Sequence, residues 1–111
     1  MCLVLKITKI ALCIISYAVE THLEQITLFG LLDEVFRILD VGNEENVIIA
    51  LKIVAKILFS LQILELEKRI PILTKFQELD SLPVLQTLQL SPHAEIRLKA
   101  NLAFAKLIIY F

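Results

Sequence analysis

The chain has 111 residues, of which 58% are hydrophobic, and its formal net charge is −1. This length gives room for one domain, and the near-zero charge excludes a global electrostatic attraction to nucleic acid or to an anionic membrane. The apolar runs are shorter than the ~18 residues that a membrane span requires, so we expect no membrane span. The only two cysteines, Cys2 and Cys13, lack a CxxC spacing, which favours reduced thiols in the cytoplasm or nucleus.

The first part of the chain predicts two helices and a kink. Residues 3–19 are apolar enough for a core helix, which we favour over a cleaved signal peptide because the central apolar run is short. Thr21 and Glu24 have the spacing of a capping box and predict a short helix that stops at Gly30, where glycine suits a left-handed kink. Another helix is expected over residues 31–40, where apolar residues recur at steps of three and four.

The next helix has the clearest start signal in the chain. Asn43 is suited to cap it, and Glu44 and Glu45 would lie in its first turn, where the positive end of the helix dipole favours carboxylates. The predicted helix spans residues 44–61 and is apolar almost all round. Such a pattern is typical of a helix that has neighbours on both sides.

The second half of the chain also has helical patterns. Residues 65–80 predict one or two helices, with Pro71 near a helix start or a kink. A short helix is expected over residues 82–90. The Ser-Pro pair at 91–92 supplies an N-cap and a first helical residue for the last helix, over residues 92–110. No segment alternates with the period of a β-strand, so the fold class expected is all-α.

The sequence repeats itself at a distance of 50 residues. Each of these residues meets an equivalent residue 50 positions later: Leu32, Val35, Ile38, Ala50, Ala55, Lys56 and Ile57. The fragment at 8–15 lies 42 positions before a similar one at 50–57. Repeats of roughly 40 residues or slightly more are typical of stacked helical hairpins or triplets. We therefore predict a single domain made of a partial unit and two full units, over residues 1–19, 20–61 and 62–111.

These features resemble armadillo repeats. The resemblance rests on Leu-Pro-Val-Leu at 82–85, a Ser-Pro-x-x-Glu turn at 91–95 and an alanine-rich helix at 100–105. Residues 30–57 match the same pattern, with Leu32-Asp33 replacing Ile-Pro. The resemblance covers nearly the whole chain as about two and a half units. It implies a right-handed α-solenoid that forms part of a longer array.

Armadillo solenoids typically bind extended peptides along the groove formed by their third helices, so the resemblance implies a non-enzymatic protein-interaction scaffold. The nuclear-import adaptors of the family use a ladder of Trp and Asn there. The equivalent positions in this chain are Ile14, Lys56 and Lys106 for Asn, and Ile10, Lys52 and Leu102 for Trp. The ladder is absent, and lysines would repel a basic import signal. A nuclear transport adaptor is therefore only a minor alternative.

The candidate groove residues are Lys52, Lys56, Asn101 and Lys106. Lysines in the groove of catenin-type armadillo proteins grip acidic peptides, and the resemblance implies that Lys52, Lys56 and Lys106 anchor an acidic, extended segment of a partner protein. Asn101 could also line the groove or be a simple exposed residue. The alternative for the lysines is a solvated position whose aliphatic stem covers apolar surface.

Catalytic and metal-binding patterns are lacking in the sequence. His22 and His93 each fall at the start of a predicted helix without a Cys, Asp or His at ligand spacing, so we expect no enzyme, no metal site and no cofactor. The first and last residues of the chain are apolar, whereas solenoids need polar terminal faces. The second functional hypothesis is therefore a structural assembly subunit that packs through its apolar ends, as an oligomer or in a larger complex.

Overall fold

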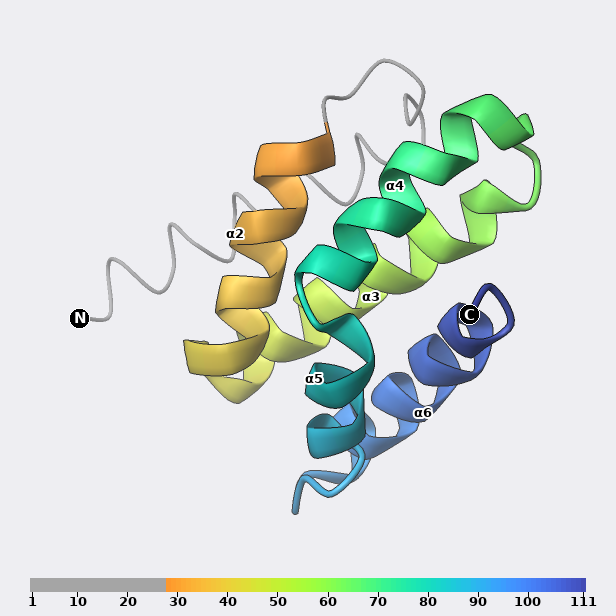
Figure 1. The fold of residues 1–111 in the computed structure, drawn as a ribbon. Coiled ribbons are helices and arrows are strands. Elements are labelled where there is room, and N and C mark those ends of the chain that lie inside the picture. The colour runs from red at the N-terminus through yellow and green to blue at the C-terminus, as the bar shows by residue number, and fades with distance from the viewer. Residues whose placement is uncertain (1–27) are drawn as a thin grey trace.

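The computed structural model describes residues 28–111. The predicted helix over residues 3–19, the capping box at Thr21, and Cys2, Cys13 and His22 lie outside these residues, as do the groove positions Ile10 and Ile14. The described part is helical throughout its regular structure and contains no strand, which confirms the all-α class (Figure 1). Its helices are α2 (Leu28–Val41), α3 (Glu44–Leu61), α4 (Leu66–Glu78), α5 (Ser81–Leu88) and α6 (Ala94–Ile108).

Helix α2 continues through Gly30, so the helix stop predicted at this glycine is wrong. A glycine inside a helix costs only about 1 kcal/mol relative to alanine. One face of α2 is buried in the core, and burying each large apolar side chain contributes about 1.5–3 kcal/mol, which outweighs that cost. The buried residues of α2 are Leu32, Val35, Phe36, Ile38 and Leu39.

The turn between α2 and α3 is tight, and it confirms the predicted cap. The Gly42 amide donates a hydrogen bond to the Ile38 carbonyl over 2.7 Å. Asn43 Oδ1 accepts a hydrogen bond from the Asn46 amide over 2.8 Å, so Asn43 is the N-cap of α3. A Cβ atom on Gly42 would lie 2.5 Å from the Ile38 oxygen, which leaves no room for any other residue in this turn.

The segment after α3 forms one helix, α4, that contains Pro71 in its interior. Proline has no N–H to donate and usually interrupts a helix. Pro71 lies on the exposed side of α4, and the helix continues on both sides of it. The helix ends because Asp80 adopts a left-handed conformation, with φ 52° and ψ 45°. That residue turns the chain into α5, so the region predicted as one or two helices is one helix followed by a sharp turn.

Helix α6 starts later than the Ser-Pro pair predicted. Its N-cap is His93 and not Ser91, and Pro92 precedes the helix. Ser91 Oγ accepts a hydrogen bond from the His93 amide over 3.1 Å, and the Ser91 carbonyl accepts one from Arg97 Nη1 over 2.9 Å. The serine thus stabilises a turn before the helix, a role that its hydroxyl fills as readily as capping.

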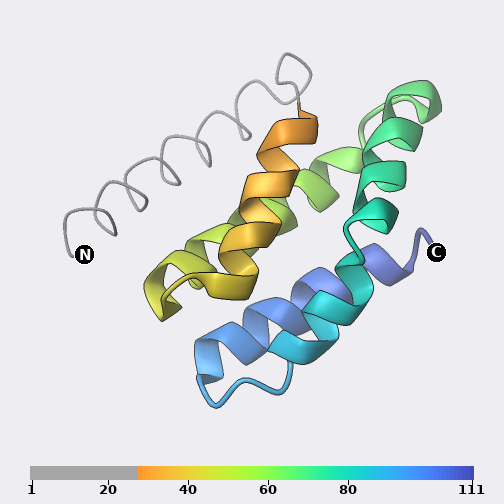
Figure 2. The same ribbon diagram turned by 60° about the vertical axis from the view of Figure 1, so that its left-hand side comes forward.

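Helix α3 lies between α2 and α6, which confirms the prediction that it has neighbours on both sides. Figures 1 and 2 show α3 and α6 side by side and running in the same direction, with α5 packed against α6 in the way that α2 packs against α3. Ala50 and Ala100, which are related by the 50-residue repeat, are both fully buried. Small residues at these equivalent positions allow the helices to approach closely.

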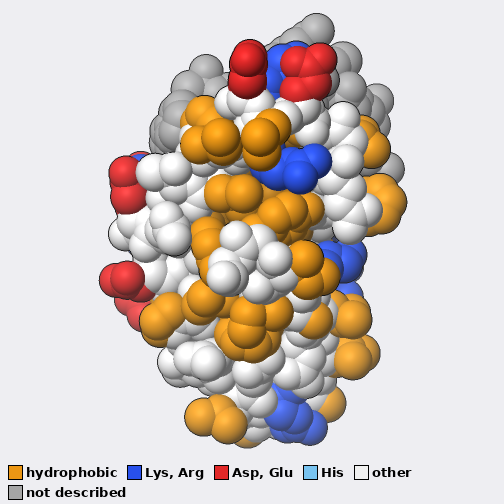
Figure 3. Space-filling model, turned by 45° about the vertical axis from the view of Figure 1, so that its right-hand side comes forward, with side chains coloured by type: hydrophobic (Ala, Val, Ile, Leu, Met, Phe, Trp, Pro, Cys, Tyr) orange, Lys and Arg blue, Asp and Glu red, His pale blue; other side chains and the backbone are white. Residues whose placement is uncertain are grey.

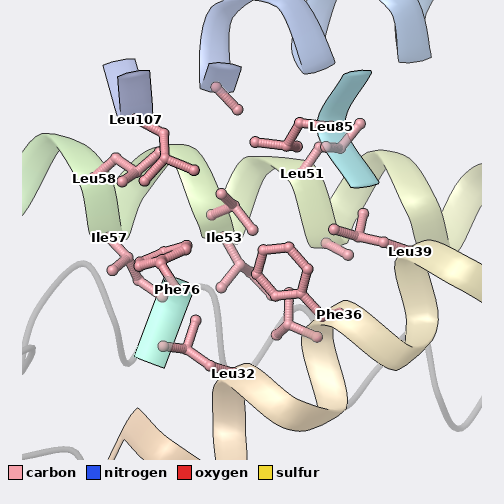
Figure 4. Packing of buried hydrophobic residues seen from close by; sticks show 14 of the residues in the cluster. Leu32, Phe36, Leu39, Leu51, Ile53, Ile57, Leu58, Phe76, Leu85 and Leu107 are labelled. Carbon is pink, nitrogen blue, oxygen red and sulfur yellow. The ribbon is translucent and has the colours of Figure 1, made fainter. Parts of the chain in front are cut away.

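One hydrophobic core joins the helices. In Figure 4, Leu58 of α3 lies beside Leu107 of α6, and Leu51 lies toward Leu85 of α5. Each of these side chains has 1% of its surface exposed or less. The pairs of residues 50 positions apart that are completely buried are Val35 and Leu85, Ala50 and Ala100, Ile53 and Ala103, and Ile57 and Leu107. The repeat seen in the sequence is therefore also a repeat of burial.

Candidate functional site

A hollow of about 440 Å³ lies where the C-terminal parts of α3 and α6 meet. We call it the α3–α6 hollow. Most of its lining comes from the last turns of α3 and from Ile63, two residues after that helix ends. The lining residues are Ala55, Lys56, Phe59, Ser60, Ile63 and Lys106. Its surface is mainly apolar, with one lysine from each helix, and no acidic residue lines it.

The floor of the α3–α6 hollow includes an exposed aromatic ring. Phe59 belongs to the helix that is apolar almost all round, yet 60% of its surface is exposed. The Lys106 Nζ atom lies 5.5 Å from the centre of the Phe59 ring. This is the geometry of a cation–π contact, in which the ammonium group is attracted to the negative face of the ring. The contact holds Lys106 against the rim of the hollow.

The structure brings Lys56 and Lys106 together and leaves the other two candidate groove residues apart. Lys56 and Lys106 are half-buried and line the same hollow. Lys52 is exposed one turn before Lys56 on the same side of α3, outside the hollow. Asn101 is exposed on α6 and does not line the hollow. The site that the geometry supports is therefore built from two lysines and an apolar floor.

The arrangement of the hollow determines which ligands it suits. Two ammonium groups beside apolar side chains attract a carboxylate, and the surrounding low-polarity surface strengthens that attraction relative to open water. The aliphatic and aromatic floor formed by Ala55, Phe59 and Ile63 offers contact area to an apolar side chain. A basic ligand would be repelled by both lysines.

His93 lies at the opposite end of α3 and α6 from the hollow, where it contacts Glu44. Its Nε2 atom lies 3.4 Å from Glu44 Oε2, so the start of α6 contacts the start of α3.

Among residues 28–111, no group of three His, Cys, Asp or Glu side chains is placed to hold a metal ion. None of the helices in this part of the chain has the length and hydropathy needed to cross a membrane.

Sequence reasoning identified the lysines of the hollow but missed its floor. The signal for the lysines was their equivalence under the 50-residue repeat. The same repeat relates Phe59 to Ile109, which is also exposed, at 79%. Both residues at this position of the repeat are therefore on the surface and not in the core.

Comparison with known proteins found no matching family model, no matching curated protein and no matching solved structure. The likeness to armadillo repeats therefore stays a prediction from the sequence.

Proposed function

We propose that this chain is a non-enzymatic protein-interaction scaffold, built as a short α-solenoid of armadillo-like units. The proposal is supported by the way α3 and α6 lie side by side in the same direction, with repeat-related residues buried in both. In a solenoid, each unit buries its apolar face against the next one. Helix α3 contacts both α2 and α6, as that arrangement requires.

The function of this scaffold is to hold an acidic, extended segment of a partner protein in the α3–α6 hollow. One observation carries the proposal: Lys56 and Lys106 occupy equivalent positions in two units and line the same apolar hollow. In an extended segment, alternate side chains point to the same side, about 7 Å apart. In a segment with a carboxylate and an apolar residue two positions apart, the carboxylate would contact a lysine while the apolar side chain contacts the apolar lining of the hollow.

The expected energies are modest. A partly exposed ion pair contributes up to about 1 kcal/mol, which corresponds to about fivefold in affinity. Placing a glutamate at both lysine positions would replace two attractions by two repulsions, so we expect a loss of more than about tenfold. The binding should also weaken as salt is added, because salt screens partly exposed charges.

The experiment uses fluorescent 12-residue peptides of alternating sequence and measures their binding to the chain by fluorescence anisotropy. The test peptide, called the Glu-Leu peptide, repeats Glu-Ser-Leu-Ser, so that Glu and Leu occupy alternate positions on the same side of the extended chain. One comparison peptide has Lys in place of Glu, and another has Ser in place of Glu. The variant Lys56→Glu/Lys106→Glu is compared with Lys68→Glu/Lys99→Glu, whose lysines lie outside the hollow. Each variant replaces two positive by two negative charges, so both have a net charge of −1 − 4 = −5.

We expect the Glu-Leu peptide to bind most tightly, and only the variant in the hollow to lose this preference. Far-UV circular dichroism and urea unfolding establish that both variants remain folded. Equal losses in the two variants would show that net charge, and not the hollow, attracts the peptide. Equal binding of all three peptides would exclude the proposed preference for acidic segments.

A second candidate function, the assembly subunit, is favoured by a different observation. Leu98 and Leu102 are large apolar residues on the outer side of α6, with exposed fractions of 60% and 54%. A surface of this kind suits packing against another protein surface and not against water.

A further inference from the structure

The contact between Phe59 and Lys106 joins two units of the repeat at the α3–α6 hollow. Phe59 lies in the last turn of α3 and Lys106 in the last turn of α6, and both line the hollow. The Lys106 Nζ atom lies over the Phe59 ring. Among the described residues, no carboxylate forms an ion pair with Lys106. An aromatic ring therefore holds this ammonium group, and its charge remains available to an anion from another molecule.

The ring restricts a side chain that would otherwise be flexible. A lysine loses much rotamer freedom when its ammonium group is fixed, and this loss opposes the binding of a ligand. Because Lys106 already lies over the Phe59 ring, less of its freedom is lost when a carboxylate binds. An ammonium group has three N–H donors, so those that point away from the ring remain able to donate to the carboxylate.

The surroundings of the contact favour an acidic ligand. Figure 3 turns the right-hand side of Figure 1 forward, where α3 and α6 end. Hydrophobic side chains gather over this face with basic side chains among them, and the acidic side chains in view lie at the top and the left edge. The hollow itself has no acidic lining residue that would compete for Lys106.

We propose that Phe59 is a positioning residue for the recognition of acidic segments, because its ring holds Lys106 where a carboxylate can reach it. This inference rests on the proposed binding of an acidic segment in the hollow. It gives Phe59 two separable effects. The side chain contacts apolar residues of the partner directly, and it acts on the carboxylate through Lys106. Only the second effect requires an aromatic ring.

The first test measures how much each variant prefers the Glu-Leu peptide over the peptide that has Ser in place of Glu. Both peptides carry the same leucines, so the ratio of their affinities isolates the contribution of the carboxylates. Phe59→Leu keeps an apolar side chain but removes the ring. We expect it to lower this ratio about two- to fivefold, which corresponds to the about 0.5–1 kcal/mol of an exposed cation–π contact.

Two further variants separate the ring from a general disturbance of the fold. Phe59→Trp should keep or raise the ratio, because indole is the best of the aromatic rings for a cation–π contact. Phe111→Leu is the matched control, since Phe111 is an exposed phenylalanine outside the α3–α6 hollow, and it should leave the ratio unchanged. Far-UV circular dichroism and urea unfolding establish that all these variants remain folded.

A double-mutant cycle tests whether Phe59 acts through Lys106. In the original chain Lys106→Met should lower the ratio, and in Phe59→Leu it should lower the ratio less, because both changes remove the same contact. Lys56→Met should lower the ratio by the same factor in both backgrounds. This difference between the two lysines would identify Lys106 as the residue that the ring positions.

NMR detects the contact without any peptide. An aromatic ring shifts the signals of protons above its face to higher field. The ε-methylene protons of Lys106 should therefore resonate at higher field in the original chain than in Phe59→Leu. The same protons should stay shifted in Phe59→Trp and in the Phe111→Leu control.

Three results would overturn the inference. An unchanged ratio in Phe59→Leu, with the Glu-Leu peptide still preferred, would show that Lys106 needs no ring, and it would leave the proposed function intact. Unchanged Lys106 signals in Phe59→Leu would show that the contact does not form in solution. If the original chain had no preference for the Glu-Leu peptide, the proposed function would be wrong, and this inference with it.

Discussion

The ring of Phe36 in α2 meets the ring of Phe76 in α4 edge to face, with ring centres 5.8 Å apart and planes at 84°. Phe76 is completely buried and Phe36 has 5% of its surface exposed. Figure 4 shows both rings below α3, where they fill the space between three helices. An edge-to-face pair adds about 0.5–1.5 kcal/mol to the free energy of burying the two rings. This contact joins two residues that are 40 positions apart in the sequence.

Replacing Phe76 by alanine should therefore destabilise the fold strongly. We expect Phe76→Ala to lower the free energy of unfolding by about 3–5 kcal/mol, because it removes buried contacts and leaves a cavity. Urea unfolding followed by circular dichroism measures this change. The control is Phe59→Ala, which removes an exposed ring and should cost less than about 1 kcal/mol. Similar losses in both variants would contradict the buried position of Phe76.

The turn at Gly42 should tolerate no side chain. A Cβ atom there would lie 2.5 Å from the Ile38 carbonyl oxygen, a backbone atom that cannot turn away. We expect Gly42→Ala to lower the free energy of unfolding by about 1–3 kcal/mol, as overpacking does elsewhere. Asp40→Ala, at an exposed position in the same last turn of α2, should change it by less than about 0.5 kcal/mol. Thermal unfolding of the two variants distinguishes them.

Asp80 holds the left-handed turn between α4 and α5. A left-handed conformation costs an ordinary residue about 1–2 kcal/mol, and glycine avoids this cost. Asp80→Gly is therefore expected to keep or raise the unfolding temperature, and Asp80→Ala to lower it. Gln77→Gly, in the last turn of α4, should lower it, since glycine is unfavourable at a residue with right-handed helical conformation. If Asp80→Gly were as harmful as Gln77→Gly, the left-handed turn would be wrong.

The pair of Glu34 and Arg37 predicts a small dependence of stability on pH. The hydrogen bond from Arg37 lowers the pKa of Glu34 below its ordinary value of 4.5. Because the pKa is lower in the folded chain, ionised Glu34 adds stability above pH 4.5, and this contribution disappears as pH falls through the folded pKa. Both side chains are more than half exposed, so the effect should be small and should decrease with salt.

The measurement for this pair is a carboxyl titration by NMR. Glu34 should titrate at lower pH in the original chain than in Arg37→Met. Urea unfolding should show the original chain more stable than Arg37→Met at pH 7 and equally stable near pH 2. Identical titration midpoints in the two proteins would contradict the hydrogen bond.

Much of the fold could be predicted from local signals. The start of α3 follows from the Asn43 cap and the first-turn glutamates, and both signals act within a few residues. The start of α6 could not be predicted in this way, because the Ser91 hydroxyl can serve a turn as well as a helix. The stop predicted at Gly30 is wrong for a different reason: burial of α2 overrides a local preference that costs about 1 kcal/mol.

The candidate site was only half predictable. Lys56 and Lys106 share a repeat position, so the sequence alone brings them together. Phe59 lies in an apolar helix, and its exposure depends on how far α6 extends along α3. That relation between two helices is set by the packing of the whole core, and it has no local signal.

The two apolar sides of α6 have a consequence for folding kinetics. A chain that is still collapsing can dock α6 by Leu98 and Leu102 as readily as by Ala100 and Ala103, and it must release the wrong face before the native contacts form. Such competing contacts slow refolding. Refolding from urea should therefore include a slow step at all protein concentrations. The variant Leu98→Lys/Leu102→Lys should remove this step, because it leaves α6 with a single apolar side.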